Sequence, residues 1–146
     1  MGAVAGAAPP RGSSISRARR FEAERQWRKI RRVPKLSLTL ITRDEAANLA
    51  AALDSVAWAD EIVVVDSESR DATVDVARRY TSKVLVRPWS GYVEQKNRAA
   101  EEATHDWILS IDADERVTPE LAAEIQALMR DEPAAAGYRV PRVTFH

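Results

Sequence analysis

The chain has 146 residues, of which 45% are hydrophobic and 30% are charged, and its formal net charge is zero. This length and composition are typical of one soluble globular domain, and no apolar run approaches the roughly 20 residues that a membrane-spanning helix needs. The chain contains no cysteine, which excludes a disulfide framework, a zinc–thiolate site and a cysteine nucleophile.

The charge is unevenly distributed along the sequence. Residues 1–34 carry nine Arg and Lys against two Glu, a net charge of +7, so the remainder carries −7. Residues 1–14 are rich in Ala, Gly, Pro and Ser and cannot bury enough surface to offset the entropy lost on ordering. We therefore interpret residues 1–34 as a basic, disordered leader and residues 35–146 as the folded domain. The alternative is an interaction arm, for which we expect contact with a membrane surface and no nucleic-acid partner.

From residue 35 onward, short runs of aliphatic and β-branched residues alternate with segments of helical spacing. The predicted elements, in chain order, are a strand at 36–42, a helix within 43–56, a strand at 61–66, a helix capped by Asp71, a strand at 83–88, a helix over 91–104, a strand at 106–112, a helix over 119–130 and a last strand within 136–145, broken by Pro141.

Apolar spacing and capping residues define the predicted helices. The first helix is expected to bury Leu49 and Leu53, and the second to bury Val74 and Ala77. Thr118 is predicted to be the N-cap of the last helix, with Pro119 at its first position.

This alternation predicts an α/β fold with a mainly parallel sheet and helices on both faces. Ligands of such sheets bind beyond the carboxyl ends of the strands. Thr42, Asp66 and the pair Asp112 and Asp114 all fall at predicted strand ends. The sequence therefore brings polar groups from three strands to one edge of the sheet.

Asp112 and Asp114 are separated by one residue at the end of an apolar strand. Alternate residues of extended chain point the same way, and two adjacent carboxylates are unfavourable unless a cation or donor compensates. Hard oxygen ligands select Mg²⁺ or Mn²⁺, which needs few protein ligands when substrate phosphates complete its shell. The alternative is a pair of solvated loop acids. Haloacid-dehalogenase-type phosphatases are excluded, because Arg116 stands where their motif has Thr or Val.

Several longer stretches carry a family resemblance. "LITRDEAANL", "WADEIVVVDSESRDATVDVARRY", "VRPWSGYVEQKNRAAEEATHDWILSIDADE" and "GYRVPR" follow one another in this order. Over residues 36 to about 142 the chain resembles family 2 glycosyltransferases, whose nucleotide-sugar-binding half has the Rossmann-like GT-A fold. It is most similar to the subgroup that adds a sugar, often glucose, to the inner core of lipopolysaccharide or lipooligosaccharide.

The resemblance implies roles for individual residues. Thr42 and Glu45 would border the base and ribose, Asp66 would accept a hydrogen bond from the uracil or ribose, Lys96 would meet the uridine or diphosphate, Asp112 would lie near the ribose, and Asp114 would contact the metal. Three of these residues have structural alternatives: Glu45 can favour a helix N-terminus, Asp66 can cap a turn, and Lys96 can be a surface lysine. Trp58, Trp89 and Trp107 are interpreted as packing residues rather than sugar platforms.

The sequence departs from the family pattern in two ways. Glu68 stands where the family has a glycine, so a positive φ at this position would be strained. Family members also continue well past residue 146, into a half that binds the acceptor and supplies the catalytic base. No base can therefore be assigned in this chain, and a sheet ending at the fifth strand would leave an exposed edge.

The resemblance implies an inverting transferase that moves a sugar, expected to be glucose, from a UDP-sugar to a lipid-linked or lipopolysaccharide core acceptor with Mg²⁺ or Mn²⁺. Such an enzyme would be cytoplasmic, with a peripheral position at the inner membrane if the leader contacts lipid. Two alternatives remain: a non-catalytic nucleotide-binding or interaction module, and a nucleotidyltransferase-like enzyme, which also uses strand-end carboxylates and a metal.

Overall fold

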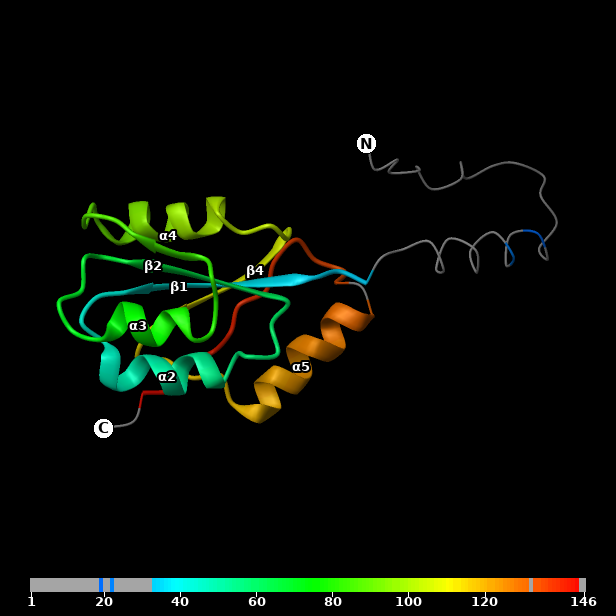
Figure 1. Ribbon diagram of the computed structural model, residues 1–146. Coiled ribbons are helices and arrows are strands. Elements are labelled where there is room, and N and C mark those ends of the chain that lie inside the picture. Colours follow the sequence, from blue (N-terminus) through cyan, green and yellow to red (C-terminus); the bar gives the residue numbers. More distant parts are fainter. Residues whose placement is uncertain (1–18, 20–21, 23–32, 132, 145–146) are drawn as a thin grey trace. The chain divides into compact units, whose positions relative to one another are not determined.

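The computed structural model describes Arg19, Glu22 and residues 33–131 and 133–144 (Figure 1). The expectations for the basic leader fall almost entirely outside the described residues, and the boundary at residue 34 stays a prediction. Among the helices of the described residues, none is both long and apolar enough to cross a membrane.

A four-stranded parallel sheet forms the centre of the domain, in the order β3-β2-β1-β4. The strands are β1 (Leu36–Thr42), β2 (Glu61–Asp66), β3 (Val84–Val86) and β4 (Trp107–Asp112). In the register of the sheet, Thr42 lies opposite Asp66 and Ile41 lies opposite Asp112. The carboxyl ends of β1, β2 and β4 are therefore level with one another, as the sequence predicted.

Helices cover both faces of this sheet (Figure 1). They are α2 (Ala46–Asp54), α3 (Thr73–Arg78), α4 (Tyr92–Glu101) and α5 (Pro119–Arg130). In Figure 1, α4 lies on one face, and α2, α3 and α5 lie on the other. The predicted α/β class with a parallel sheet and two covered faces is confirmed.

The larger hydrophobic core fills the face under α2, α3 and α5. Leu38 and Leu40 of β1 pack there with Leu49 and Leu53 of α2, and all four side chains are at most 1% exposed. Burying a leucine of this kind stabilises the fold by roughly 1.5–3 kcal/mol. The opposite face has a smaller core, in which Ala99 of α4 packs with β1 and β2. Strands covered on both faces read as continuous apolar runs, which is why residues 36–42 and 61–66 were recognisable.

Helix α5 begins as its sequence predicts. Thr118 is in extended conformation and its hydroxyl accepts a hydrogen bond from the amide of Leu121 at 3.2 Å, while Pro119 takes the first helical position. A threonine cap followed by proline satisfies one free amide and removes another. The helix ends at Arg130, as expected.

The predicted start of α3 and its predicted buried face were wrong. Asp71 is not the N-cap residue; its carboxylate accepts the amide of Thr73, and the helix begins there. The buried face consists of Thr73, Val76 and Ala77, whereas Val74 is only half-buried. A start at Thr73 places i, i+3 and i+4 toward the core, which moves the apolar stripe away from Val74.

Two strand predictions also need correction. The strand expected within 136–145 is not formed in its described part, residues 136–144. Pro141 has no amide to donate, so a ladder with β4 would be interrupted there. Strand β3 is limited to Val84–Val86, since Pro88 cannot extend its pairing and β3 lies at the sheet edge. Among the described residues, the sheet therefore has four strands and not five.

Candidate functional site

A pocket of about 590 Å³ opens at the carboxyl ends of β1 and β4. It is lined by Ile41, Thr42, Arg43, Glu45, Trp89, Tyr92, Asp112, Ala113 and Asp114. The chain leaves β1 toward α2 on one face of the sheet and enters β4 from α4 on the other, so the pocket lies at the topological switch point of the sheet. Ligands of open α/β sheets bind at this point.

The pocket joins four of the six residues that the sequence nominated. Thr42, Glu45, Asp112 and Asp114 all line it, although they come from two segments of the chain about 70 residues apart.

Thr42 places an unpaired hydroxyl in the wall of this pocket. Its side chain lies at the end of β1, the residue is 5% exposed, and its Oγ1 has no hydrogen-bond partner in the described part of the chain. A buried polar group without a partner costs roughly 1–3 kcal/mol. A ligand that hydrogen-bonds this hydroxyl would recover that cost.

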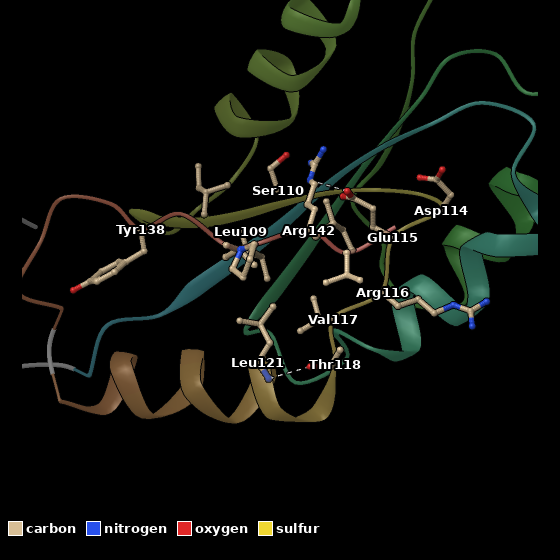
Figure 2. A pocket seen from close by; sticks show the side chains of 15 residues that line it. Leu109, Ser110, Asp114, Glu115, Arg116, Val117, Thr118, Leu121, Tyr138 and Arg142 are labelled. Atoms are coloured by element: carbon tan, nitrogen blue, oxygen red, sulfur yellow. Dashed lines mark hydrogen bonds and ion pairs between the residues drawn. The ribbon is translucent and has the colours of Figure 1, made fainter. Parts of the chain in front are cut away.

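The carboxylates beside the pocket are paired with two cations. Lys96 of α4 places Nζ 3.0 Å from Oδ1 of Asp112, and Arg142 places Nη2 3.8 Å from Oδ2 of the same residue. Arg142 also contacts Glu115, with Nε 2.8 Å from Oε1, and Figure 2 shows its side chain lying beside Glu115. Glu115 in turn accepts the amide of Asp112 at 2.8 Å. Lys96 thus reaches the pocket edge through Asp112, although it does not line the pocket.

Asp112 and Asp114 are the oxygen donors that a divalent cation would use. Asp114 is exposed, and no group of three or more His, Asp or Glu within the described residues is arranged to hold a metal. Two carboxylates are nevertheless sufficient for Mg²⁺ when phosphate oxygens and water complete its octahedron. The donor set therefore fits a cation that binds together with a diphosphate.

Asp66 lies beside the pocket but does not line it. The residue is fully buried, and its two carboxylate oxygens accept hydrogen bonds from Ser69: Oδ2 from the amide at 2.8 Å, and Oδ1 from the hydroxyl. Between them, Glu68 has φ = 56°, the positive value that the glycine of the family pattern would adopt without strain. Asp66 closes the turn after β2, and contact between Asp66 and a ligand stays a prediction.

The loops after β1 and β2 are joined by an interaction that we call the loop clasp. It consists of four hydrogen bonds: the amide of Asp44 to Ser69 Oγ at 2.8 Å, the amide of Glu45 to Thr73 Oγ1 at 2.8 Å, the amide of Ala46 to Asp71 Oδ2 at 3.1 Å, and the amide of Arg70 to Asp44 Oδ1 at 2.7 Å. The hydroxyl of Thr73 also donates to Asp71 and holds the pKa of that carboxyl below its ordinary value. The clasp fixes the segment that carries Glu45.

A second pocket, of about 670 Å³, lies between β4 and the segment Tyr138–Val143 (Figure 2). Asp114 and Glu115 line it at one end, and Tyr138 lines it at the other. The ring of Tyr138 lies 6.1 Å from that of Trp107. Asp114 therefore belongs to the walls of both pockets.

The three tryptophans of the described domain differ in their surroundings. Trp58 packs against the larger core and donates to the carbonyl of Ser55 at 3.0 Å, and Trp107 contacts Tyr138, so both are packing residues as expected. Trp89 belongs to neither core cluster and is 43% exposed in the wall of the switch-point pocket. Its assignment as a packing residue was wrong, because its side chain is exposed at a pocket and does not lie in a core.

Sequence reasoning did not nominate Arg142, Ser69 or Tyr92 for this region. Arg142 contacts residues 27 and 30 positions earlier and has no local sequence signal, whereas Ser69 could have been found from its position three residues after Asp66, whose carboxylate it bonds. Tyr92 could have been found from its position beside Trp89 in "WSGY".

At the opposite, amino edge of the sheet, Glu61 is the centre of a polar network. Burial alone would raise its pKa, but hydrogen bonds from Lys83, Ser37 and Thr104 outweigh this and lower the pKa to about 2. The side chain is 14% exposed. This network joins β1, β2 and the start of β4 and has no contact with the pocket.

The fold is similar to that of two solved structures. M. tuberculosis glucosyl-3-phosphoglycerate synthase matches with a TM-score of 0.56 and 22% identity, over 74% of this chain and 44% of that chain. S. aureus TarS matches with a TM-score of 0.54 and 24% identity, over 66% of this chain and 32% of that chain. These likenesses establish a GT-A-type fold, as the sequence predicted.

Sequence comparison identifies relatives whose names are those of glycosyltransferases. An uncharacterized glycosyltransferase of Rickettsia felis is 43% identical over 115 residues, covering 77% of this chain and 41% of the relative. The lipopolysaccharide core biosynthesis glycosyltransferase LpsC of Rhizobium meliloti is 34% identical over 117 residues, covering 75% of this chain and 43% of LpsC. The chain thus spans about two fifths of the length of these relatives. Residues 37–144 match the sequence profile described as "Glycosyl transferase family 2", and the chain belongs to that family.

Proposed function

We propose that this chain is the donor-binding part of a glycosyltransferase that transfers a sugar, glucose in the first instance, from a UDP-sugar to a lipopolysaccharide core acceptor. The observation that carries the proposal is the pocket at the switch point, where the unpaired hydroxyl of Thr42 and the carboxylates of Asp112 and Asp114 lie in one wall. A nucleoside diphosphate could form a hydrogen bond with the Thr42 hydroxyl. The divalent cation that accompanies the diphosphate could bind the carboxylates of Asp112 and Asp114.

The donor and cofactor assignments are supported by related structures. The M. tuberculosis synthase has been crystallised with Mg²⁺ and UDP, and with Mn²⁺, UDP and glucosyl-3-phosphoglycerate. By analogy, Asp114 and Asp112 would hold Mg²⁺ or Mn²⁺, which neutralises charge on the departing diphosphate when it is bound.

The residues of the chain itself would bind and orient the donor. Lys96 is a point charge that suits a phosphate and already lies at the pocket edge on Asp112. Thr42 and Glu45 would border the nucleoside. An acceptor hydroxyl, deprotonated by a general base, would attack the anomeric carbon in line and expel UDP with inversion.

The lipopolysaccharide acceptor rests on the name of the Rhizobium relative, LpsC. A donor pocket serving such an acceptor would work at the cytoplasmic face of the inner membrane, where lipid-linked core precursors are accessible. Contact of the basic leader with that surface is part of the same proposal.

Calorimetry tests the proposal directly. UDP, UDP-glucose and CTP are titrated into the chain with and without Mn²⁺, and into a variant that combines Asp112→Asn with Asp114→Asn. Asp106→Asn is the matched control, because Asp106 is exposed and precedes β4 at the end away from the pocket. We expect Mn²⁺-dependent binding of UDP that is lost in the double variant and kept in the control.

The other outcomes identify the alternatives. Equal binding of CTP and UDP would favour a nucleotidyltransferase-like enzyme. A folded chain that binds none of the three nucleotides would be an interaction module. UDP binding that is unchanged in the double variant would refute the metal-site assignment.

A further inference from the structure

Two aromatic rings stand at the mouth of the switch-point pocket, outside both hydrophobic cores. Trp89 is 43% exposed and Tyr92 is 71% exposed, and both line the pocket. Their ring centroids are 4.8 Å apart and their planes are at 85°, an edge-to-face contact. Exposed aromatic surface of this size beside a polar pocket has no packing role in the domain.

The segment from Pro88 to Tyr92, which carries these rings, is held in place by a buried side chain of α4. Gln95 is fully buried, and its Nε2 donates to the carbonyl of Pro88 at 2.9 Å and to Ser67 Oγ at 3.2 Å. Gly91 lies between the rings with φ = 105°, a conformation that a side chain would strain, and its carbonyl accepts the amide of Gln95. The rings are thus preorganised, which lowers the entropy cost of binding a ligand.

The position of the rings relative to the charged groups limits what they can contact. Tyr92 and Lys96 are four residues apart on α4 and lie on the same side of the helix, about 6 Å from each other. Lys96 pairs with Asp112, where the diphosphate is proposed to bind. In a nucleotide, the ribose separates the base from the phosphates by a comparable distance.

We propose that Trp89 and Tyr92 form an aromatic wall for the uracil ring of the donor nucleotide, in which Trp89 stacks face-on and Tyr92, at 85° to it, buttresses Trp89. This inference rests on the proposed function and names additional binding residues of the same site. The flat π-face of uracil suits such a wall, and base stacking on aromatic side chains is sequence-tolerant, so the wall supplies affinity while hydrogen bonds elsewhere select the base. The wall recognises the nucleoside whichever sugar the donor carries.

The test measures the dissociation constant of UDP with Mn²⁺ for the full chain and for the variants Trp89→Ala, Trp89→Phe and Tyr92→Ala. Loss of one stacking ring is expected to weaken UDP binding about tenfold or more for Trp89→Ala, and Trp89→Phe should stay within about threefold of the parent. Val93→Ala is the matched control: Val93 is the neighbouring residue, is 75% exposed and does not line the pocket.

A second ligand separates stacking from a general disturbance of the site. Inorganic pyrophosphate with Mn²⁺ offers the phosphates without a base, so its binding should be equal in Trp89→Ala and in the parent. If Trp89→Ala weakens the binding of pyrophosphate as much as the binding of UDP, the inference is overturned, since the substitution would then act on the phosphate subsite. Thermal unfolding followed by circular dichroism checks that each variant is folded.

The remaining outcomes distinguish this inference from the proposed function. If the parent chain does not bind UDP, the proposed function fails. If the parent binds UDP and both alanine variants bind it equally well, only the aromatic wall is refuted. If UDP binding is unchanged but UDP-glucose binds more weakly, the rings contact the sugar, and the assignment to uracil is wrong.

Discussion

Replacing Thr42 with valine should make the protein more stable and weaken its nucleotide binding. The hydroxyl of Thr42 is buried without a partner, a state that costs roughly 1–3 kcal/mol. Valine has nearly the same shape, keeps the strand preference of the position and removes the polar atom. We expect the free energy of unfolding to rise by about 1 kcal/mol, and the affinity for UDP to fall about fivefold because one neutral hydrogen bond to the ligand is lost.

Thr73→Val provides the matched control, because it is the same chemical change at a paired hydroxyl. Thr73 is fully buried, and its Oγ1 accepts the amide of Glu45 at 2.8 Å and donates to Asp71. Losing both bonds should lower the free energy of unfolding by about 2 kcal/mol. The two variants should therefore shift stability in opposite directions.

Urea unfolding followed by circular dichroism gives the two stability changes, and calorimetry with UDP and Mn²⁺ gives the affinities. If Thr42→Val destabilises the protein as Thr73→Val does, the Thr42 hydroxyl has a partner and the reasoning fails. If Thr42→Val is stabilising but binds UDP as the parent does, the hydroxyl does not contact the ligand.

Three further outcomes follow from the structure. The pKa of Glu61 is lowered from 4.5 to about 2, so its contribution to stability is complete above pH 4.5 and is lost as the pH falls toward 2; Glu61→Gln should cost about 2 kcal/mol in urea unfolding at pH 7, and a gap that does not narrow at pH 3 would contradict this. Glu68→Gly should raise the free energy of unfolding by about 1 kcal/mol, because φ = 56° is strained for glutamate. A lower free energy of unfolding in urea would show that contacts of the Glu68 side chain outweigh this strain. Lys96→Ala should change stability by less than about 1 kcal/mol, since its pair with Asp112 is 35% exposed on both sides, yet weaken UDP binding in calorimetry about tenfold; unchanged binding would remove Lys96 from the site.

The sequence was sufficient to predict the parts of the fold that depend on one segment at a time. Residues 36–42 and 61–66 are short runs of mainly aliphatic and β-branched residues because both faces of their strands are covered, and this pattern identified β1 and β2 with their observed bounds. Thr118 followed by Pro119 located the start of α5 to the residue. Strand-end positions then predicted that Thr42, Asp112 and Asp114 would share one edge, and they line one pocket.

The errors arose where distant contacts decide the structure. Val74 and Val76 are equally apolar, and the sequence pattern did not show that α3 begins at Thr73, whose amide donates to Asp71, so that Val76 and not Val74 faces the core. The segment after Gly137 has the composition of a strand, but it lies beside β4 without pairing, and Arg142 connects it to Glu115 through a side chain. Trp89 was assigned to packing because composition cannot tell whether a loop turns its aromatic residue toward the sheet or toward a pocket.

The loop clasp has a consequence for how donor preference can change in proteins of this architecture. Asp44 both donates to the Ser69 hydroxyl and accepts from Arg70, and the amide of Ala46 needs Asp71, so each loop supplies acceptors that the other requires. A loop transplanted alone from a homologue, or lengthened by one residue, would leave amides of its partner without their acceptors, including the part-buried amide of Glu45. Recombination should therefore succeed only when both loops are exchanged together, as one cassette.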